Sequence, residues 1–421
     1  MLPFDLPWYR RLIGLAVGIG AAGGVLGLIY LGSTGAVIGW LFGDAGTALW
    51  SGSWQWIPLL SIGGLVVAAL RKAWHVPKKV PGGVEIIEAG EVNHKTAPQW
   101  VVITAISAMA GASLGPSLAL VIMGGALGSW IAERRWAEGR ANQDYTLTGI
   151  AGGLGAAFTA PILGAFLVSE LGPTPRTRYV AAIIPQLISA SFGFLIFYLV
   201  VGRTFLGSYD LPPYEFEVAD MITAVVLGVL AAIIMAVLVA VVVAVKQVTQ
   251  LVTNSYILGT VGGAAVGLIA VALPLTLGAG QSQLDTVIEN ASVLGVGLLL
   301  AVLVGKMVAM SLSLAVGFMG GNVFPMIFIG GTAGVIVHVI FPDVPYALAV
   351  SCMMAAVPGS FLRAPVSMTM IAVVAISLGA EGIAPVAMAV VTAYLLVAVA
   401  RYLITQRREQ VAGAEISAGE A

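Results

Sequence analysis

Residues 115–128 read GPSLALVIMGGALG, and residues 321–334 read GNVFPMIFIGGTAG. Each stretch opens with a glycine ahead of an apolar segment, and a Gly-Gly pair stands nine positions after that glycine, at 124–125 and at 330–331. The two copies lie 206 residues apart, counted from Gly115 to Gly321. A pattern that recurs at a fixed separation indicates an internal duplication.

A second landmark supports the same duplication. Ala160–Pro161 follows the first copy and Ala364–Pro365 follows the second, and these pairs lie 204 residues apart. Small-residue pairs are common in membrane helices, so a single match carries little weight. Two landmarks in nearly one register favour a chain made of two related halves of about two hundred residues.

The composition indicates that this duplicated chain lies in a membrane. Hydrophobic residues make up 59% of the 421 positions and charged residues only 9%, whereas roughly a quarter of a soluble domain is charged. Apolar stretches long enough to span or nearly span a bilayer fall near 12–41, 56–70, 99–132, 146–170, 179–201, 219–245, 255–275, 291–317, 323–341, 346–377 and 383–404. Several are very long and contain Gly and Pro, which favours broken and re-entrant helices. We therefore predict an all-α, polytopic membrane protein with two inverted-topology repeats.

The same features predict how the chain is organised. The expected parts are a cytoplasmic N-terminus at 1–11, a first membrane repeat at 12–200, a connection at 201–219, a second repeat at 220–408 and a disordered tail at 409–421. Basic residues near both ends, namely Arg10, Arg11, Arg401, Arg407 and Arg408, favour a multi-pass protein of the cell membrane with both termini in the cytoplasm.

Several classes of function are not indicated by the sequence. No basic field suggests a nucleic-acid partner, and no nucleotide fingerprint, nucleophile motif or metal cluster stands out. Cys352 is the only cysteine, so no intramolecular disulfide can form. We expect neither an enzyme nor a bound cofactor or metal.

The repeats themselves suggest where a substrate binds. Duplicated transporters often place the substrate between the repeats, at the N-termini of broken helices. Such a terminus offers unpaired N–H groups and the positive end of the helix dipole, which suits an anion without a basic side chain. Lys306 is the main cation inside an apolar stretch. It either has a function there or extends to a membrane interface.

Five segments resemble the CLC family of chloride channels and chloride/proton exchangers. They are VPGGVEIIEAG at 80–90, GASLGPSLALVIMGGALG at 111–128, GGLGAAFTAPILGAFLVSEL at 152–171, MGGNVFPMIFIGGTAG at 319–334 and MMAAVPGSFLRAPVSMTMIAVV at 353–374. The resemblance extends from about residue 12 to 408. Each segment alone is weak, but their order and spacing are specific as a set.

The resemblance implies an anion path and the residues along it. Backbone amides near Ser117, Leu118, Asn322 and Val323 are expected to bind the anion. The lining or gate is expected to include Pro81, Gly82, Gly83, Gly115, Pro116 and Phe324. A late tyrosine closes the inner end of the path in the family; Tyr402 is the nearest candidate here, and Tyr394 is a weaker one. The resemblance also implies a homodimer with one pore in each subunit.

The departures from the family pattern bear on proton coupling. Ser117 takes the position of the gating Glu, and a serine does not ionise at working pH, although its hydroxyl can donate to an anion or cap its helix. Leu171 takes the position of the inner relay Glu, unless a shift by one residue makes Glu170 the relay. Pro81 or Gly82 replaces a serine that influences anion preference, and Val323 stands where the family has a phenylalanine, with Phe324 following.

These residues lead to one prediction and two alternatives. The prediction is passive flow of a small anion, chloride by default, across the lipid bilayer without proton coupling. The first alternative is a proton-coupled antiporter of chloride, fluoride or nitrate that uses Glu170. The second is a non-transporting regulatory membrane subunit, because loss of the gating Glu fits that reading as well.

Overall fold

A computed structural model describes residues 5–43, 49–50, 52–77, 80–135, 139–158, 160–202 and 209–419, with side chains described as far as residue 407. In the first half the helices are α1 (Pro7–Phe42), α2 (Trp56–Ala73), α3 (Gly83–Ala89), α4 (Ala97–Met109), α5 (Ser117–Arg134), α6 (Arg140–Gly155), α7 (Pro161–Leu171), a 3₁₀ turn η1 (Arg176–Arg178) and α8 (Tyr179–Val201). In the second half they are α9 (Asp220–Thr249), α10 (Ser255–Ala272), a 3₁₀ turn η2 (Pro274–Thr276), α11 (Gln281–Glu289), α12 (Ala291–Val316), α13 (Val323–Ile340), α14 (Tyr346–Phe361), α15 (Pro365–Ile376) and α16 (Ile383–Gly419).

Three of the long apolar stretches are broken, as predicted. Residues 99–132 divide into α4 and α5, with Gly111 at a φ of +87° between them. Residues 146–170 divide into α6 and α7, and residues 346–377 divide into α14 and α15. Pro161 and Pro365 each stand at the first position of the second helix, where the missing N–H costs nothing.

The helix boundaries repeat with the register of the sequence motif. α5 and α13 begin 206 residues apart and end 206 residues apart, and the same is true of α6 and α14. Just ahead of α5 and α13, Gly115 N donates to Gly321 O at 2.7 Å and Gly321 N donates to Gly115 O at 2.8 Å. This bridge is antiparallel, so the two helices leave it in opposite directions. The predicted inverted topology is confirmed.

A second pair of hydrogen bonds obeys the same register. Ser113 N donates to Ser313 Oγ at 3.2 Å, and Met319 N donates to Ser107 Oγ at 3.0 Å. Each serine hydroxyl also donates to the carbonyl four residues earlier in its own helix. The two donors, Ser113 and Met319, are 206 residues apart, and so are the two acceptors, Ser107 and Ser313. The contacts between the two halves are therefore related by a two-fold pseudosymmetry.

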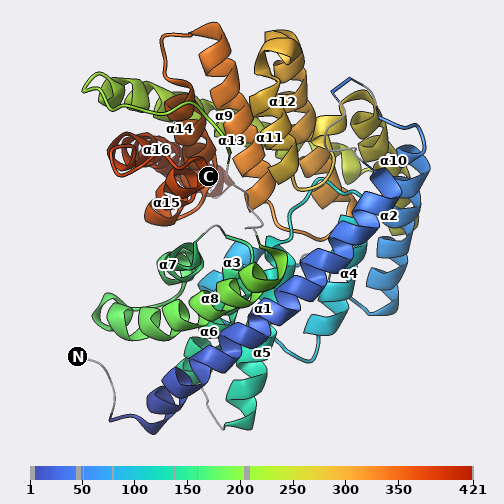
Figure 1. Cartoon of the computed structure of the whole chain (residues 1–421). Helices are drawn as coiled ribbons and strands as arrows, with labels where there is room; N and C mark the ends of the chain where they lie inside the picture. The colour runs from blue at the N-terminus through green and yellow to red at the C-terminus, as the bar shows by residue number, and fades with distance from the viewer. Residues whose placement is uncertain are drawn as a thin grey trace.

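The two halves are also interleaved, since α2 of the first half packs along α10 of the second (Figure 1). The contact is close because a Cβ added at Gly64 would lie 2.0 Å from Gly259 O, and one added at Gly259 would lie 2.5 Å from Gly64 O. Small residues of this kind let membrane helices approach closely. Glycine is therefore required at both positions.

By length and composition, eight described helices can cross a membrane, namely α1, α2, α8, α9, α10, α12, α13 and α16. Most of them expose large apolar side chains outwards, which suits a lipid solvent. α13 differs, because 83% of its apolar window is buried inside the protein. This helix lies at the centre of the fold.

Two parts of the predicted organisation stay predictions. The connection at 201–219 falls partly outside the described residues, which resume at Tyr209. α16 extends to Gly419 and so covers most of the segment 409–421, for which the sequence predicts a disordered tail. Residues 420 and 421 lie outside the described part of the chain.

Candidate functional site

A small buried cavity of about 20 Å³ lies where the two halves meet. Its lining comes from α3, α5, the end of α6, α7, the start of α13 and the end of α14, and consists of Gly83, Val84, Ile87, Ser117, Val121, Leu154, Phe158, Leu167, Leu171, Gly321, Asn322, Val323 and Leu362. A water molecule needs about 10–15 Å³ by this kind of measure, so the cavity has room for roughly one particle of that size.

Helices from opposite halves begin at this cavity. α5 starts at Ser117 and α13 starts at Val323, and both residues line it. The first N–H groups of a helix have no partner within the helix, and the dipole places partial positive charge at the same end. The cavity is therefore electropositive without a basic side chain among its lining residues.

α3 also begins at the cavity, but it carries its own carboxylate. Gly83 is its first residue, and the side chain of Glu85 accepts a hydrogen bond from Gly82 N. This capping contact occupies one donor of the Pro81–Gly83 turn and fixes the conformation of the turn. The first turns of α5 and α13, in contrast, contain no acidic side chain.

Ser117 is 7% exposed and faces the opposite half of the protein. A Cβ added at Gly321 would lie only 1.8 Å from Ser117 Oγ, so the hydroxyl reaches directly over the glycine of the bridge. Within the described residues, no protein group is hydrogen-bonded to this hydroxyl. It is thus available as a donor beside the helix start.

The two candidates for the inner relay position point in different directions. Leu171 is buried and lines the cavity. The Glu170 carboxylate instead accepts from Val366 N at 3.0 Å, from Ser367 N at 2.8 Å and from the Ser367 hydroxyl. Successive helix residues are rotated by roughly 100°, which is why adjacent side chains separate in this way. Glu170 caps the N-terminus of α15 and ties the first half to the second.

Aromatic side chains support the bridge between the halves. Phe324 stacks on Phe158, with ring centroids 6.3 Å apart and planes 11° apart. A Cβ added at Gly115 would lie 3.0 Å from the Cβ of Phe324, so Phe324 packs against the bridge. Phe324 does not line the described cavity, whereas Phe158 does. The sequence prediction named Phe324 and missed Phe158, although the motif FTAP at 158–161 was visible.

Other predicted residues lie beside the cavity or away from it. Pro81, Gly82, Gly115, Pro116 and Leu118 flank lining residues without lining the cavity themselves. Tyr402 is not brought to the cavity, because its side chain on α16 is 62% exposed and its hydroxyl accepts from Gln406 Nε2 at 3.1 Å. Tyr394, half-buried on the same helix, does not line the cavity either.

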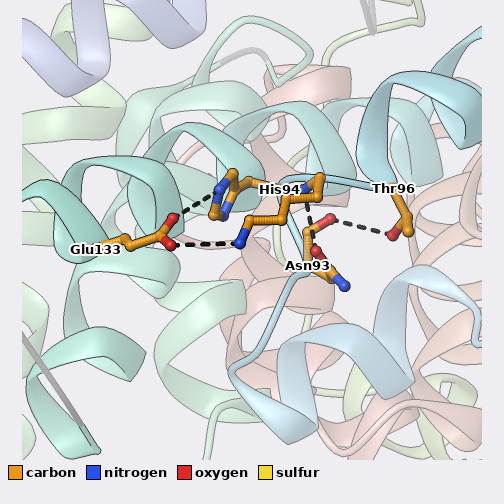
Figure 2. Close-up of polar contacts among 5 residues, drawn as sticks. Asn93, His94, Thr96 and Glu133 are labelled. Atoms are coloured by element: carbon orange, nitrogen blue, oxygen red, sulfur yellow. Dashed lines mark hydrogen bonds and ion pairs between the residues drawn. The ribbon is translucent and has the colours of Figure 1, made fainter.

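The far end of α5 is tied to the loop that follows α3 (Figure 2). Glu133 pairs with His94 Nε2 at 2.8 Å and with Lys95 Nζ at 3.5 Å. The loop is braced locally, because Asn93 Oδ1 accepts from Lys95 N and Asn93 O accepts from the Thr96 hydroxyl. These exposed contacts hold the loop between α3 and α4 against the C-terminal end of α5, and each is expected to contribute only about 0–1 kcal/mol.

Comparison with known proteins identifies the fold. A family model described as voltage gated chloride channel matches residues 63–398. Among solved structures, a slow cyanobacterial Cl⁻/H⁺ antiporter superposes with a TM-score of 0.78 at 19% identity, covering 92% of this chain and 95% of that one. A CLC-type fluoride/proton antiporter superposes with a TM-score of 0.76 at 17% identity and the same coverage. At these identities the structures establish a shared fold.

Two curated relatives match the sequence, one over about half of this chain and the other over most of it. An uncharacterized protein of Methanocaldococcus jannaschii is 30% identical over 193 residues, which is 45% of this chain and only 47% of that relative. A putative ion-transport protein, YfeO, of Escherichia fergusonii is 25% identical over 361 residues, covering 84% of this chain and 83% of the relative. The second match extends over most of both chains.

Proposed function

This chain belongs to the voltage gated chloride channel (CLC) family, and from that premise we propose that it conducts a small monovalent anion, chloride by default, across a membrane. One observation carries the proposal: α5 and α13, from opposite halves, begin at a single buried cavity. Their free N–H groups can bind an anion by charge-assisted hydrogen bonds. The hydroxyl of Ser117 and the amide of Asn322 add side-chain donors at the same place.

We further propose that this flow is passive and is not coupled to protons. Proton transfer through a membrane protein needs side chains that gain and lose a proton. None of the described lining residues ionises, since Ser117 and Leu171 stand at the two positions where the family resemblance implies glutamates. Glu170 supports the proposal as well, because its carboxylate is already bound to the start of α15.

The deciding experiment is a simultaneous record of chloride efflux and external pH. Purified protein is reconstituted in chloride-loaded liposomes, and valinomycin with potassium sets the voltage. We expect chloride efflux without proton movement. Efflux accompanied by opposing proton movement contradicts uncoupled flow, and efflux no faster than from empty liposomes, with fluoride and nitrate also tested, contradicts anion transport.

One observation favours a second candidate, a proton-coupled antiporter. Both superposed structures are described as proton antiporters, one of chloride and one of fluoride. In that case Glu170 is the available carboxylate near the cavity, one residue from Leu171. Proton movement that disappears in Glu170→Gln while anion movement persists would favour this candidate.

Two features of the assembly belong to the proposal. We place both termini in the cytoplasm because of the basic residues Arg10, Arg11, Arg401, Arg407 and Arg408. Labelling of single cysteines introduced near the ends, in a Cys352→Ser background, checks this orientation in sealed vesicles. We also propose a homodimer with one pore in each chain, and cross-linking in liposomes at low protein-to-lipid ratio tests it.

A further inference from the structure

Lys306 is a fully buried cation in the second half of the protein. Its side chain is 0% exposed, so it does not extend to a membrane interface. The ammonium donates to Thr276 O at 3.1 Å and to Gly278 O at 2.7 Å, and it lies 5.0 Å from the centre of the Phe328 ring. Carbonyl oxygens and an aromatic face are partners that suit a positive charge.

No acid neutralises this charge within the part of the chain that the structure describes. The ion pairs found there involve His94 and Lys95 with Glu133, and none involves Lys306. A buried charge is costly unless it is well solvated by protein dipoles. Here two backbone carbonyls accept hydrogen bonds from the ammonium and stabilise its protonated form.

The ammonium stands directly behind the turn that leads into α5. Thr276 O, which accepts from Lys306, also accepts from the Ser113 hydroxyl at 3.0 Å, so one carbonyl oxygen separates the two donors. Gly278 N in turn donates to Gly111 O at 3.4 Å. The turn at 111–115 continues through Gly115 to Ser117 at the cavity. On its other side Lys306 meets α13 at Phe328, five residues after Val323.

We propose that Lys306 is the fixed cation of the anion path: its ammonium positions the turn that starts α5 and raises the affinity of the cavity for an anion. It acts through other groups and is a positioning residue. A positive charge behind the path attracts an anion in the cavity, and this attraction is much stronger in a protein interior than in water. The role has no counterpart in the first half, where the position 206 residues earlier is Trp100.

The test compares charged and neutral substitutions and measures anion binding, because the inference deepens the proposed transport function and must be separable from it. Chloride dissociation constants are measured by calorimetry on the full-length protein in detergent, and efflux is measured in liposomes. We expect Lys306→Met and Lys306→Gln to raise the chloride dissociation constant about tenfold. Lys306→Arg, which keeps the charge, should stay within about twofold of the wild type.

Lys306→Gln distinguishes charge from mere support, because its amide can still donate to a carbonyl. If folded Lys306→Gln binds chloride like the wild type, the proposal is wrong. Where the neutral variants do not fold, Ser113→Ala decides, since it removes only the hydroxyl that shares Thr276 O. Ser113→Ala should weaken chloride binding about two- to threefold, and unchanged binding overturns the proposal. A wild type that binds chloride but does not move it contradicts the transport function alone.

Discussion

The N-terminal ends of α5 and α13 share one backbone arrangement but have different side chains. Both follow a glycine of the Gly115–Gly321 bridge, and the hydrogen bonds around them repeat with one offset. Yet the first residue of α5 is Ser117 and the first residue of α13 is Val323. The duplication supplies a symmetric frame, and the side chains at paired positions of this frame differ.

The same contrast explains why the cavity lies to one side of the pseudosymmetry axis. α3 of the first half lines it, but no residue of the corresponding helix α11 does. On the α11 side, a Cβ added at Gly280 would lie 2.8 Å from the Cβ of Phe328, and the Tyr209 hydroxyl donates to Gln281 O at 3.2 Å. Side chains beside α11 therefore occupy the region that corresponds, in the other half, to the cavity beside α3.

We expect the strongest loss of function from alanine substitutions at the two glycines that form the bridge. A Cβ at Gly321 would meet Ser117 Oγ at 1.8 Å, whereas one at Gly115 would meet the Phe324 Cβ at 3.0 Å. We expect Gly321→Ala to lose at least tenfold in anion flux, and more than Gly115→Ala, because a Cβ at position 321 forces the Ser117 hydroxyl to rotate away from its place at the cavity and overpacks the bridge. Adding Ser117→Ala should restore part of the stability. Equal losses from the two glycine variants would contradict the placement of Ser117.

A carboxylate introduced at position 117 should act as a gate at the start of α5, with no equivalent at the start of α13. We expect Ser117→Glu to reduce chloride flux about tenfold or more at neutral pH, because the carboxylate competes for the same donors. Acidification protonates a carboxylate and so ends its competition for these donors, and flux should therefore rise as the pH is lowered from about 7 to about 4. Ser117→Gln is the matched control, and its flux should not depend on pH. A Ser117→Glu protein with wild-type flux and pH response would rule out this position as the gate.

Glu170 and Leu171 offer a comparison within one helix turn. Glu170→Gln should lower the stability by about 1–3 kcal/mol, because it removes charge from the bonds to Val366 and Ser367. It should leave the ratio of protons to anions unchanged. Ser367→Ala, which removes one donor to the same carboxylate, should show a smaller loss of stability. A changed proton ratio in Glu170→Gln would instead assign Glu170 to proton transfer.

The smallest effects are expected for substitutions at Asn322, which lines the cavity, and at Tyr402, which is exposed on α16. We expect Asn322→Ala to change chloride flux by about two- to fivefold, because the α13 backbone N–H groups stay in place when the side-chain amide is lost. Tyr402→Phe should have no effect, since Tyr402 is exposed and bonded only to Gln406 among the described residues. A clear loss of flux in Tyr402→Phe would revive Tyr402 as the inner gate.

Much of the site was predictable from sequence because its residues sit at helix starts. Glycine or proline residues that interrupt the apolar stretches come one or two positions before them, and these interruptions can be seen in the sequence. The residues concerned are Gly83, Ser117, Asn322 and Val323. The structure brings these four residues to one cavity. The apolar wall was not predictable in the same way, since Leu154, Leu167 and Leu362 resemble the many other leucines of the chain.

The membrane environment, the duplication and the broken helices could all be predicted from the sequence, because composition, spacing and the backbone limits of Gly and Pro are properties of the chain alone. That Leu171 and not Glu170 lines the cavity, and that Lys306 is buried behind the α5 turn, became clear only from the packed fold. Both findings have the same cause. The direction of a side chain depends on the rotation of its helix, and helix rotation is set by packing between the two halves.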